Sequence, residues 1–235
     1  MELTTMSVVG VEALLRWGRG RVLVTLTRSC TWRADGSDAS IGRWVIDEAL
    51  GLAALQSMEG WAELGMSVNV SARQLLDPGF TDAVGSALRA SGVPPGSVAI
   101  ELTETALVRD GVQAAAVLES LRSMGVVVAI DDFGTGYSSL TYLHALPVDV
   151  VKLDRSFVIG ASTDPQKGAI VEAVVNLTAA LGLAAVAEGI ESDEHIEMLR
   201  GLGCVFGQGN HIRRPMSATE LTEYLGSARG PLAQL

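Results

Sequence analysis

Short apolar runs rich in β-branched residues alternate along the chain with longer segments in which apolar residues recur every three or four positions. The first pattern is typical of strands buried on both faces, and the second of helices that pack on a sheet. The clearest run, Val126–Ile130, is followed by Asp131 and Asp132 and then by Gly134 and Gly136. We therefore expect a buried strand that ends on two adjacent carboxylates and then turns sharply.

The same alternation extends over the whole chain. In order, the other expected strands are Ser7–Leu15, Met66–Val70, Val98–Leu102, Val148–Leu153, Leu183–Ala187 and Cys204–Gly207. Helices are expected at Ile41–Leu64, after the candidate N-cap Ser71, and at Val108–Met124, Gln166–Leu181, Ser192–Leu202 (capped by Ser192 and closed by Gly203) and Ala218–Leu225. Strands and helices at this spacing predict parallel βαβ units. Because no change of composition marks an internal boundary, we expect a single domain over residues 1–235, with a tail at 226–235.

Composition narrows the class of protein. The 235 residues suffice for one α/β barrel, and 48% hydrophobic with 19% charged residues predicts a compact fold. The net charge of −10 argues against binding to long nucleic acids, which needs a basic face, but not against a small phosphate ligand held through metal ions. Cys30 and Cys204 suggest neither a disulfide framework nor a zinc site. Since neither a signal peptide nor an apolar run of membrane-spanning length is visible, we expect a cytoplasmic protein without a membrane contact.

Polar side chains follow each expected strand at the point where it ends. In order they are Glu12, Asn69, Glu101, Asp131 with Asp132, Lys152 with Asp154, Glu188 and Gln208. In an α/β barrel these ends converge on one mouth, where so many carboxylates repel one another unless cations compensate them. Oxygen ligands of this kind suit Mg²⁺ or Mn²⁺, and two such ions would support phosphodiester hydrolysis. Each acid alone is more often structural, but together they favour a metal-dependent site.

Seven motifs in order carry a family resemblance. They are Glu12-Ala-Leu-Leu-Arg-Trp, Asn69-Val-Ser, Glu101-Leu-Thr-Glu, Asp131-Asp-Phe-Gly-Thr-Gly-Tyr-Ser-Ser-Leu, Val151-Lys-Leu-Asp, Ala187-Glu-Gly-Ile-Glu and Gln208-Gly. From about Val8 to Leu225 the chain resembles the EAL domain, a family of bacterial cyclic di-GMP phosphodiesterases with a modified TIM (β/α)8-type barrel. The resemblance implies hydrolysis of cyclic di-GMP to linear pGpG by a metal-activated water, with two Mg²⁺ or Mn²⁺ ions per active site.

The resemblance also implies roles for individual residues. It makes Glu12, Asn69, Glu101, Asp131, Asp132 and Glu188 metal ligands, and Glu12, Asp132, Lys152 and Glu188 catalytic residues. Lys152 matches a lysine that orients or deprotonates the attacking water. The implied substrate contacts are Leu15, Arg16, Asp154 and Gln208, with the guanidinium fork of Arg16 suited to a phosphate.

A loop after Asp132 is implied to couple the metal site to a dimer interface. Its residues are Phe133, Gly134, Thr135, Gly136, Tyr137 and Ser138, and Glu104 is the glutamate linked to it. The resemblance therefore implies a homodimer, and association with GGDEF or sensory proteins.

Three departures from the family pattern leave alternatives open. The usual first strand, with a Gln-Pro dipeptide, is missing, and segment 18–40 lacks the usual motifs. Val205 and Asn210 stand where an aspartate and an aromatic residue are usual. A barrel without its opening strand would expose two edges, to be covered by a partner chain, by Val22–Leu26 or by nothing. The alternative function is a catalytically impaired domain that serves as a cyclic di-GMP receptor or as a dimerising interaction module.

Overall fold

The structure is a computed structural model. It describes residues 1–14, 16–19, 22–25, 37–58, 60–61, 64–108, 111–135, 143 and 146–227, with the backbone alone described for 16–19, 22–25, 37–41, 58, 108, 111 and 112. Within these residues, no helix has the length and apolar character needed to span a lipid bilayer.

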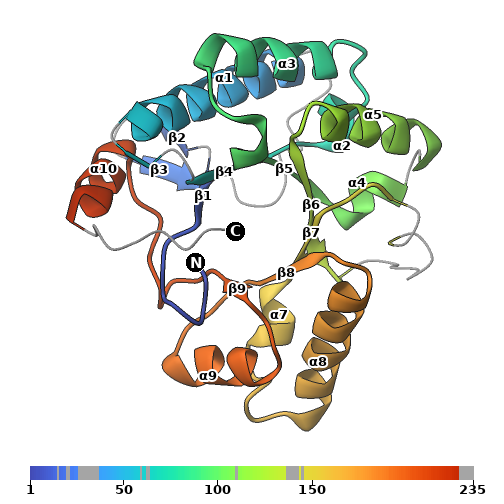
Figure 1. The fold of residues 1–235 in the computed structure, drawn as a ribbon, viewed down its shortest axis with the longest axis vertical. Helices are drawn as coiled ribbons and strands as arrows, with labels where there is room; N and C mark the ends of the chain where they lie inside the picture. The colour runs from blue at the N-terminus through green and yellow to red at the C-terminus, as the bar shows by residue number, and fades with distance from the viewer. Residues whose placement is uncertain are drawn as a thin grey trace.

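Parallel strands form a ring, and helices cover its outside (Figure 1). In the described residues the sheet has seven strands in the order β1-β4-β5-β6-β7-β8-β9, and every neighbouring pair is parallel. The strands are β1 (Gly10–Ala13), β4 (Gly65–Asn69), β5 (Val98–Thr103), β6 (Val127–Phe133), β7 (Val150–Leu153), β8 (Ala184–Ala187) and β9 (Phe206–Gly207). The parallel βαβ arrangement and the barrel class expected from the sequence are confirmed.

The N-terminal residues lie along β9 and bridge it to the segment that leads into β1. Glu2 pairs antiparallel with both Ser7 and Phe206. Met1 exchanges two hydrogen bonds with Gly207, at 3.1 Å from its amino group and 3.0 Å to its carbonyl oxygen. No strand precedes β1 in the described part of the chain, as expected. The N-terminal residues hydrogen-bond along the edge of β9, a covering that is not among the alternatives left open by the sequence.

A short hairpin leaves the ring directly after β1. Its strands, β2 (Arg16–Arg19) and β3 (Val22–Thr25), are antiparallel to each other and form a separate two-stranded sheet. The part of Val22–Leu26 that the structure describes therefore does not join the ring. The sequence analysis did not predict this hairpin.

Most helices follow the expected spacing, with differences at their ends. They are α1 (Ser37–Met58), α2 (Ala72–Leu75), α3 (Phe80–Ser91), α4 (Glu104–Val108), α5 (Gly111–Ser123), α7 (Arg155–Val158), α8 (Pro165–Ala180), α9 (Asp193–Gly201) and α10 (Ala218–Ser227), with a 3₁₀ turn η1 (Pro95–Ser97). The cap predictions are confirmed: the Ser71 hydroxyl accepts from the Gln74 amide in a capping box, and the Ser192 hydroxyl accepts from His195. Gly203, which follows α9, has the positive φ of 80° that such a helix end requires.

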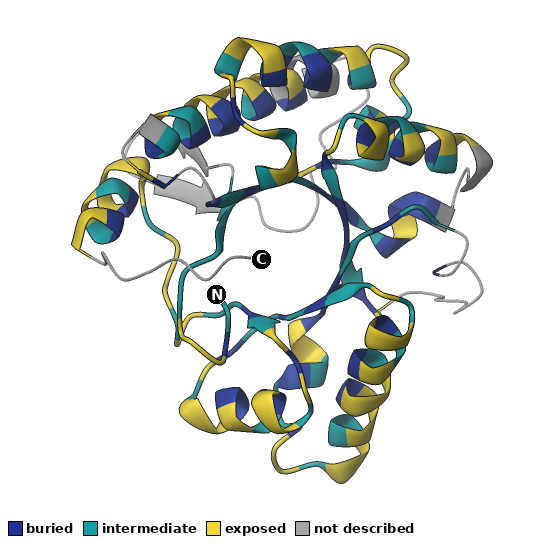
Figure 2. Ribbon diagram, in the orientation of Figure 1, coloured by how far each residue is buried: buried dark blue, intermediate teal, exposed yellow. Residues whose placement is uncertain are grey.

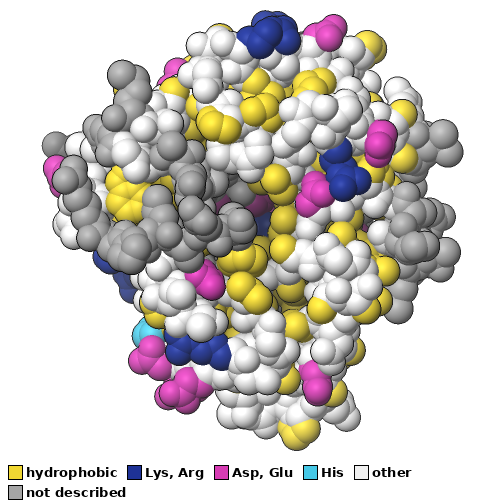
Figure 3. Space-filling view, in the orientation of Figure 1, with side chains coloured by type: hydrophobic (Ala, Val, Ile, Leu, Met, Phe, Trp, Pro, Cys, Tyr) yellow, Lys and Arg dark blue, Asp and Glu magenta, His cyan; other side chains and the backbone are white. Residues whose placement is uncertain are grey.

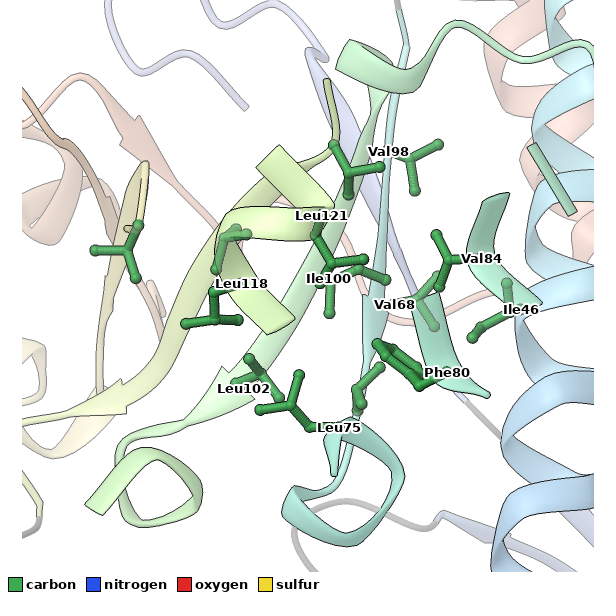
Figure 4. Close-up of a cluster of buried hydrophobic side chains, with 14 of the residues drawn as sticks. Ile46, Val68, Leu75, Phe80, Val84, Val98, Ile100, Leu102, Leu118 and Leu121 are labelled. Carbon is green, nitrogen blue, oxygen red and sulfur yellow. The ribbon is translucent and has the colours of Figure 1, made fainter. Parts of the chain in front are cut away.

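The largest core lies between the ring and its surrounding helices (Figures 2 and 4). Val68, Ile100 and Val128 stand in register on three neighbouring strands and are all 0% exposed. They pack with the fully buried Leu118 and Leu121 of α5 in the same cluster. Because alternate residues of a strand point to opposite faces, the residues between them face the axis of the ring. This alternation directs the polar residues of the motifs inward.

Candidate active site

A buried lysine lies at the centre of the polar strand ends. Lys152 projects from β7 and is 3% exposed. Its Nζ lies 2.6 Å from Glu101 Oε2, 2.8 Å from Glu188 Oε1, 3.2 Å from Asp131 Oδ1 and 3.5 Å from Glu12 Oε2. Four separate strands therefore bring carboxylates to one ammonium group. In Figure 3, acidic and basic side chains are visible at the bottom of a hollow in the middle of this face.

Two side-chain amides hold the carboxylates in position. Asn69 Nδ2 donates to Glu12 Oε1 at 2.5 Å. Gln208 Nε2 donates to Glu12 Oε2 at 2.9 Å and to Glu188 Oε1 at 3.2 Å. Gln208 thus links the end of β9 to the ends of β1 and β8. The two amide groups thus fix the orientation of the Glu12 and Glu188 carboxylates.

Asp131 and Asp132 face the same site although they are adjacent in one strand. Consecutive strand residues normally point to opposite faces. Here the register of β6 against β7 shifts between Ile130 and Phe133, and Asp132 has a left-handed φ of 54°. As a result, carboxylate oxygens of Asp131, Asp132 and Glu188 lie within 4.8 Å of one another. A bulge that redirects a side chain is a common feature beside active sites.

The pKa values of the acids in the site shift in opposite directions. Burial raises the pKa of Glu101 and of Glu188 to about 7, although the Lys152 ammonium opposes this shift. Burial also acts to raise the pKa of Glu12, but Lys152, Gln208 and Asn69 together hold it below its ordinary value. Burial acts to lower the pKa of Lys152, and the surrounding carboxylates raise it well above its ordinary value. The lysine is therefore an ammonium ion, and its one positive charge faces four carboxyl groups.

The donor set fits a divalent metal ion. Asp131 Oδ1 is buried and accepts no hydrogen bond from the described residues, although it lies 3.2 Å from Lys152 Nζ. Carboxylate and amide oxygens are the ligands that Mg²⁺ and Mn²⁺ prefer. An uncompensated cluster of buried acids is unfavourable, and bound cations would relieve it.

The loop after Asp132 is tied to α4. The Gly134 amide donates to Glu104 Oε2 at 3.1 Å, and the Thr135 amide and hydroxyl donate to the Asp132 carbonyl oxygen at 3.3 and 2.9 Å. A side chain at Gly134 would contact Phe157 at 2.7 Å, and its φ is 93°. Phe133 is buried at the end of β6. Of the expected loop residues, Gly136, Tyr137 and Ser138 lie outside the described residues.

Two expected substrate contacts stand at the edge of what the structure describes. Leu15 lies outside the described residues, and Arg16 is described only as the first backbone position of β2.

Asp154, a third expected substrate contact, lies directly after β7 and is 2% exposed. Its carboxylate Oδ1 accepts from the Ser156 amide at 3.0 Å and so caps α7.

Sequence reasoning gave no role to the glycines that follow the last two strands. A side chain at Gly209 would lie 2.2 Å from the backbone nitrogen and oxygen of Ile190. The Ile190 amide donates to the Gln208 carbonyl oxygen, and the His211 amide to the Ile190 carbonyl oxygen, both at 3.1 Å. These bonds hold the loops that carry Glu188 and Gln208 against each other. The sequence signal for this close approach is Gly209 itself, which directly follows the strand-end residue Gln208.

A parallel α/β barrel with a carboxylate-rich mouth is the class of protein that this fold and site define. A family model described as the EAL domain matches residues 1–215. This chain belongs to the EAL domain family.

Curated and solved proteins of several bacteria are similar to the chain. The bifunctional diguanylate cyclase/cyclic di-GMP phosphodiesterase MucR of Pseudomonas aeruginosa is 40% identical over 221 residues, which are 91% of this chain and 31% of MucR. The cyclic di-GMP phosphodiesterase PA2567 of the same organism is 33% identical over 232 residues, which are 96% of this chain and 38% of that protein. The chain thus spans about a third of the length of these curated relatives.

Solved structures agree with this assignment. A structure described as PaMucR phosphodiesterase in complex with c-di-GMP has a TM-score of 0.84 at 40% identity, with 91% of this chain and 87% of that chain covered. The EAL domain of Mycobacterium smegmatis DcpA has a TM-score of 0.83 at 34% identity, with 98% and 94% covered.

Proposed function

We propose that this chain is a metal-dependent phosphodiesterase that hydrolyses cyclic di-GMP to linear pGpG. The observation that carries the proposal is the mouth itself, where Lys152 contacts four carboxylates from four strand ends. Two similar curated proteins carry cyclic di-GMP phosphodiesterase in their names, and one similar structure is a complex with c-di-GMP. A receptor without turnover would not need this crowding of buried charge.

The residues proposed to hold two Mg²⁺ or Mn²⁺ ions are Glu12, Asn69, Glu101, Asp131, Asp132 and Glu188. Asp131, Asp132 and Glu188 already place carboxylate oxygens within 4.8 Å of one another. When bound, such ions lower the pKa of a water molecule and stabilise negative charge on phosphoryl oxygens.

The chain's own polar groups orient the reactants. Lys152 carries a positive charge and three N–H donors, so it holds the attacking water or a phosphoryl oxygen while neutralising nearby carboxylates. The Gln208 amide fixes Glu12 and Glu188 relative to each other. The buried position of Lys152 and Glu101 limits bulk water at the bottom of the site. Leu15, Arg16, Asp154 and Gln208 are proposed to contact the substrate.

The decisive test is hydrolysis of cyclic di-GMP with Mg²⁺ or Mn²⁺, followed by the appearance of pGpG. We expect turnover that chelation abolishes, and a loss of about a hundredfold or more in kcat for Glu12→Ala, in the range for removal of a group that acts in the transition state. Glu119→Ala removes an exposed carboxylate from α5 and is the matched control, with activity unchanged. A folded protein that binds the nucleotide but forms no pGpG would refute the enzyme and establish the receptor.

Assembly is a separate part of the proposal. We propose a cytoplasmic homodimer that couples through Glu104 and the loop that begins at Phe133, and association with GGDEF or sensory proteins. Light scattering of the purified chain with and without cyclic di-GMP would measure the mass directly, and a monomer under both conditions would contradict the dimer.

A further inference from the structure

A cavity of about 790 Å³ extends from the active site between β1, α1 and the segment that follows β9. Its lining includes Glu12, Glu188 and Gln208 of the site, and also Arg213 and Tyr224, which the proposed function has not used. This volume lies within the roughly 300–1,000 Å³ typical of small-molecule sites. The cavity therefore joins an acidic end at the proposed metal site to a wall that carries a cation.

The position of Arg213 is fixed from two sides. Its amide donates to the Gly209 carbonyl oxygen at 3.0 Å, which closes the turn after Gln208. Its guanidinium carbon lies 4.1 Å from the centre of the Tyr224 ring. This is within the distance of a cation–π contact, which orients the guanidinium plane. Arg214 lines the same cavity but has no such aromatic contact among the described residues.

The helix that carries Tyr224 is itself well anchored. Leu221 and Leu225 of α10 are buried against Trp61 and Leu64. The Ser217 hydroxyl caps the start of the helix by accepting from the Glu220 amide at 3.3 Å. Tyr224 is thus a fixed platform, and Arg213 needs little additional ordering when a ligand binds.

Among the described residues, Arg213 has no acidic partner. The chain has 27 Asp and Glu residues against 17 Lys and Arg residues, yet no carboxylate of the described residues forms an ion pair with Arg213. An arginine that is oriented by an aromatic ring, lines a cavity and has no acidic partner among the described residues is suited to an anion from solution. Its planar fork matches two oxygens of a phosphate.

We propose that Arg213 is a substrate-binding residue that contacts the phosphate of the cyclic dinucleotide that is not being attacked, and that Tyr224 positions it. The inference rests on the proposed function, because it takes cyclic di-GMP as the ligand. A cyclic dinucleotide carries two phosphodiester groups, and the metal site acts on one at a time. Binding the second group far from the reacting bond lowers KM and leaves kcat nearly unchanged.

The test compares Arg213→Ala, Arg213→Lys and the control Arg89→Ala, which removes a cation from the last turn of α3 outside the cavity lining. KM and kcat are measured with Mg²⁺, and Kd for cyclic di-GMP is measured by calorimetry in EDTA. We expect Arg213→Ala to raise KM or Kd about tenfold, the loss of one charge-assisted contact, with kcat within about twofold. Arg213→Lys restores part of the affinity, and Arg89→Ala changes nothing.

Tyr224 variants separate positioning from folding. We expect Tyr224→Phe, which keeps the ring, to behave as the wild type, and Tyr224→Leu to raise KM about threefold without a change in kcat. Melting temperatures of all variants identify any that simply loosen α10.

Each outcome leads to a distinct conclusion. Wild-type values of KM and Kd in Arg213→Ala would overturn the inference while the proposed function stands. Binding without turnover in the wild type would refute the enzyme, and Kd would still decide the role of Arg213. Neither binding nor turnover in the wild type would refute both.

Discussion

Ile100 and Glu101 are consecutive residues of β5 and are 0% and 3% exposed, yet they lie in opposite surroundings. Ile100 packs among apolar side chains between the ring and the helices, where burial stabilises the fold (Figure 4). Glu101 faces Lys152 and the other acids, and its burial makes ionisation unfavourable. The apolar side of the strand thus maintains the barrel, while the buried acid on the polar side lowers stability, a cost that the proposed binding and catalysis would explain.

The largest effect on stability is expected when the central cation is removed. Lys152→Met fills a similar volume but leaves the four surrounding acids without their ammonium partner. We expect the free energy of unfolding of the chelated protein to fall by about 4 kcal/mol at pH 8, as for a broken buried ion pair. Urea unfolding measures it. A loss of equal size at pH 5, where the carboxyls can protonate, would show that packing and not charge is responsible.

The apolar side is tested by Ile100→Ala. We expect a loss of about 3 kcal/mol, from lost burial and the cavity that remains. Because Ile100 faces away from the mouth, kcat/KM per folded molecule should change by less than about twofold. If Ile100→Ala were as stable as the wild type but inactive, the apolar side of β5 would not be the side that maintains the fold.

The contribution of Glu101 to stability is expected to depend on pH when no metal is bound. Glu101 has an ordinary pKa of 4.5 that burial raises to about 7 in the folded chain. Between these values the folded chain binds a proton that the unfolded chain has released, so stability falls as pH rises through this window. In EDTA we expect Glu101 to contribute a decrease on the order of 3 kcal/mol between pH 4.5 and pH 7. Glu101→Gln should reduce this slope, and Glu119→Gln should not.

Saturating Mg²⁺ is expected to reduce the same slope in the wild type. A bound cation favours the ionised carboxyl group, so the folded chain no longer takes up a proton in this window. A slope that is identical with and without the ion would contradict the assignment of Glu101 as a metal ligand.

The loops that carry Glu188 and Gln208 leave no room for a side chain at Gly209. Gly209→Ala would place a methyl group 2.2 Å from the Ile190 backbone, so the two loops must separate. We expect a loss of about 2 kcal/mol in stability and a lower kcat, because Gln208 moves with the loop. Gly201→Ala in α9, where a methyl group meets nothing within 4 Å, is the control. Equal stability of the two variants would show that the loops accommodate the change.

The sequence predicted the strands and the polar residue at each strand end because both follow from local patterns. Apolar runs mark buried strands, and Ser71 and Ser192 are recognisable caps. The pairing of Glu2 with Phe206 could not be predicted, since it joins distant residues through backbone groups that any sequence has. The short helices α4 and α7 contain too few residues to show a period.

Within the site, the identity of the acids was predictable but their geometry was not. Alternation along a strand would place Asp131 and Asp132 on opposite faces, and only the register shift in β6 brings them together. The cation–π contact of Arg213 with Tyr224 depends on how α10 docks, which no local motif specifies.

The smallest effect is expected at the link between the mouth and the loop after Asp132. The left-handed φ of Asp132 is unfavourable for a residue with a side chain, so neighbouring contacts must maintain it. The hydrogen bond from Gly134 to Glu104 is one of these contacts, and it lies outside the proposed ligand set. Loosening it allows the Asp132 carboxylate to leave the position in which it approaches Asp131 and Glu188.

Glu104→Gln keeps an acceptor of the same shape but removes its charge, which weakens the hydrogen bond by about 1 kcal/mol. We expect a decrease of about fivefold in kcat/KM and a higher Mg²⁺ concentration for half-maximal activity, because part of the population no longer presents Asp132 correctly. Raising the Mg²⁺ concentration should restore the rate, since metal binding selects the competent arrangement. If the rate falls but added Mg²⁺ does not restore it, Glu104 acts on the reaction by another route than the position of Asp132.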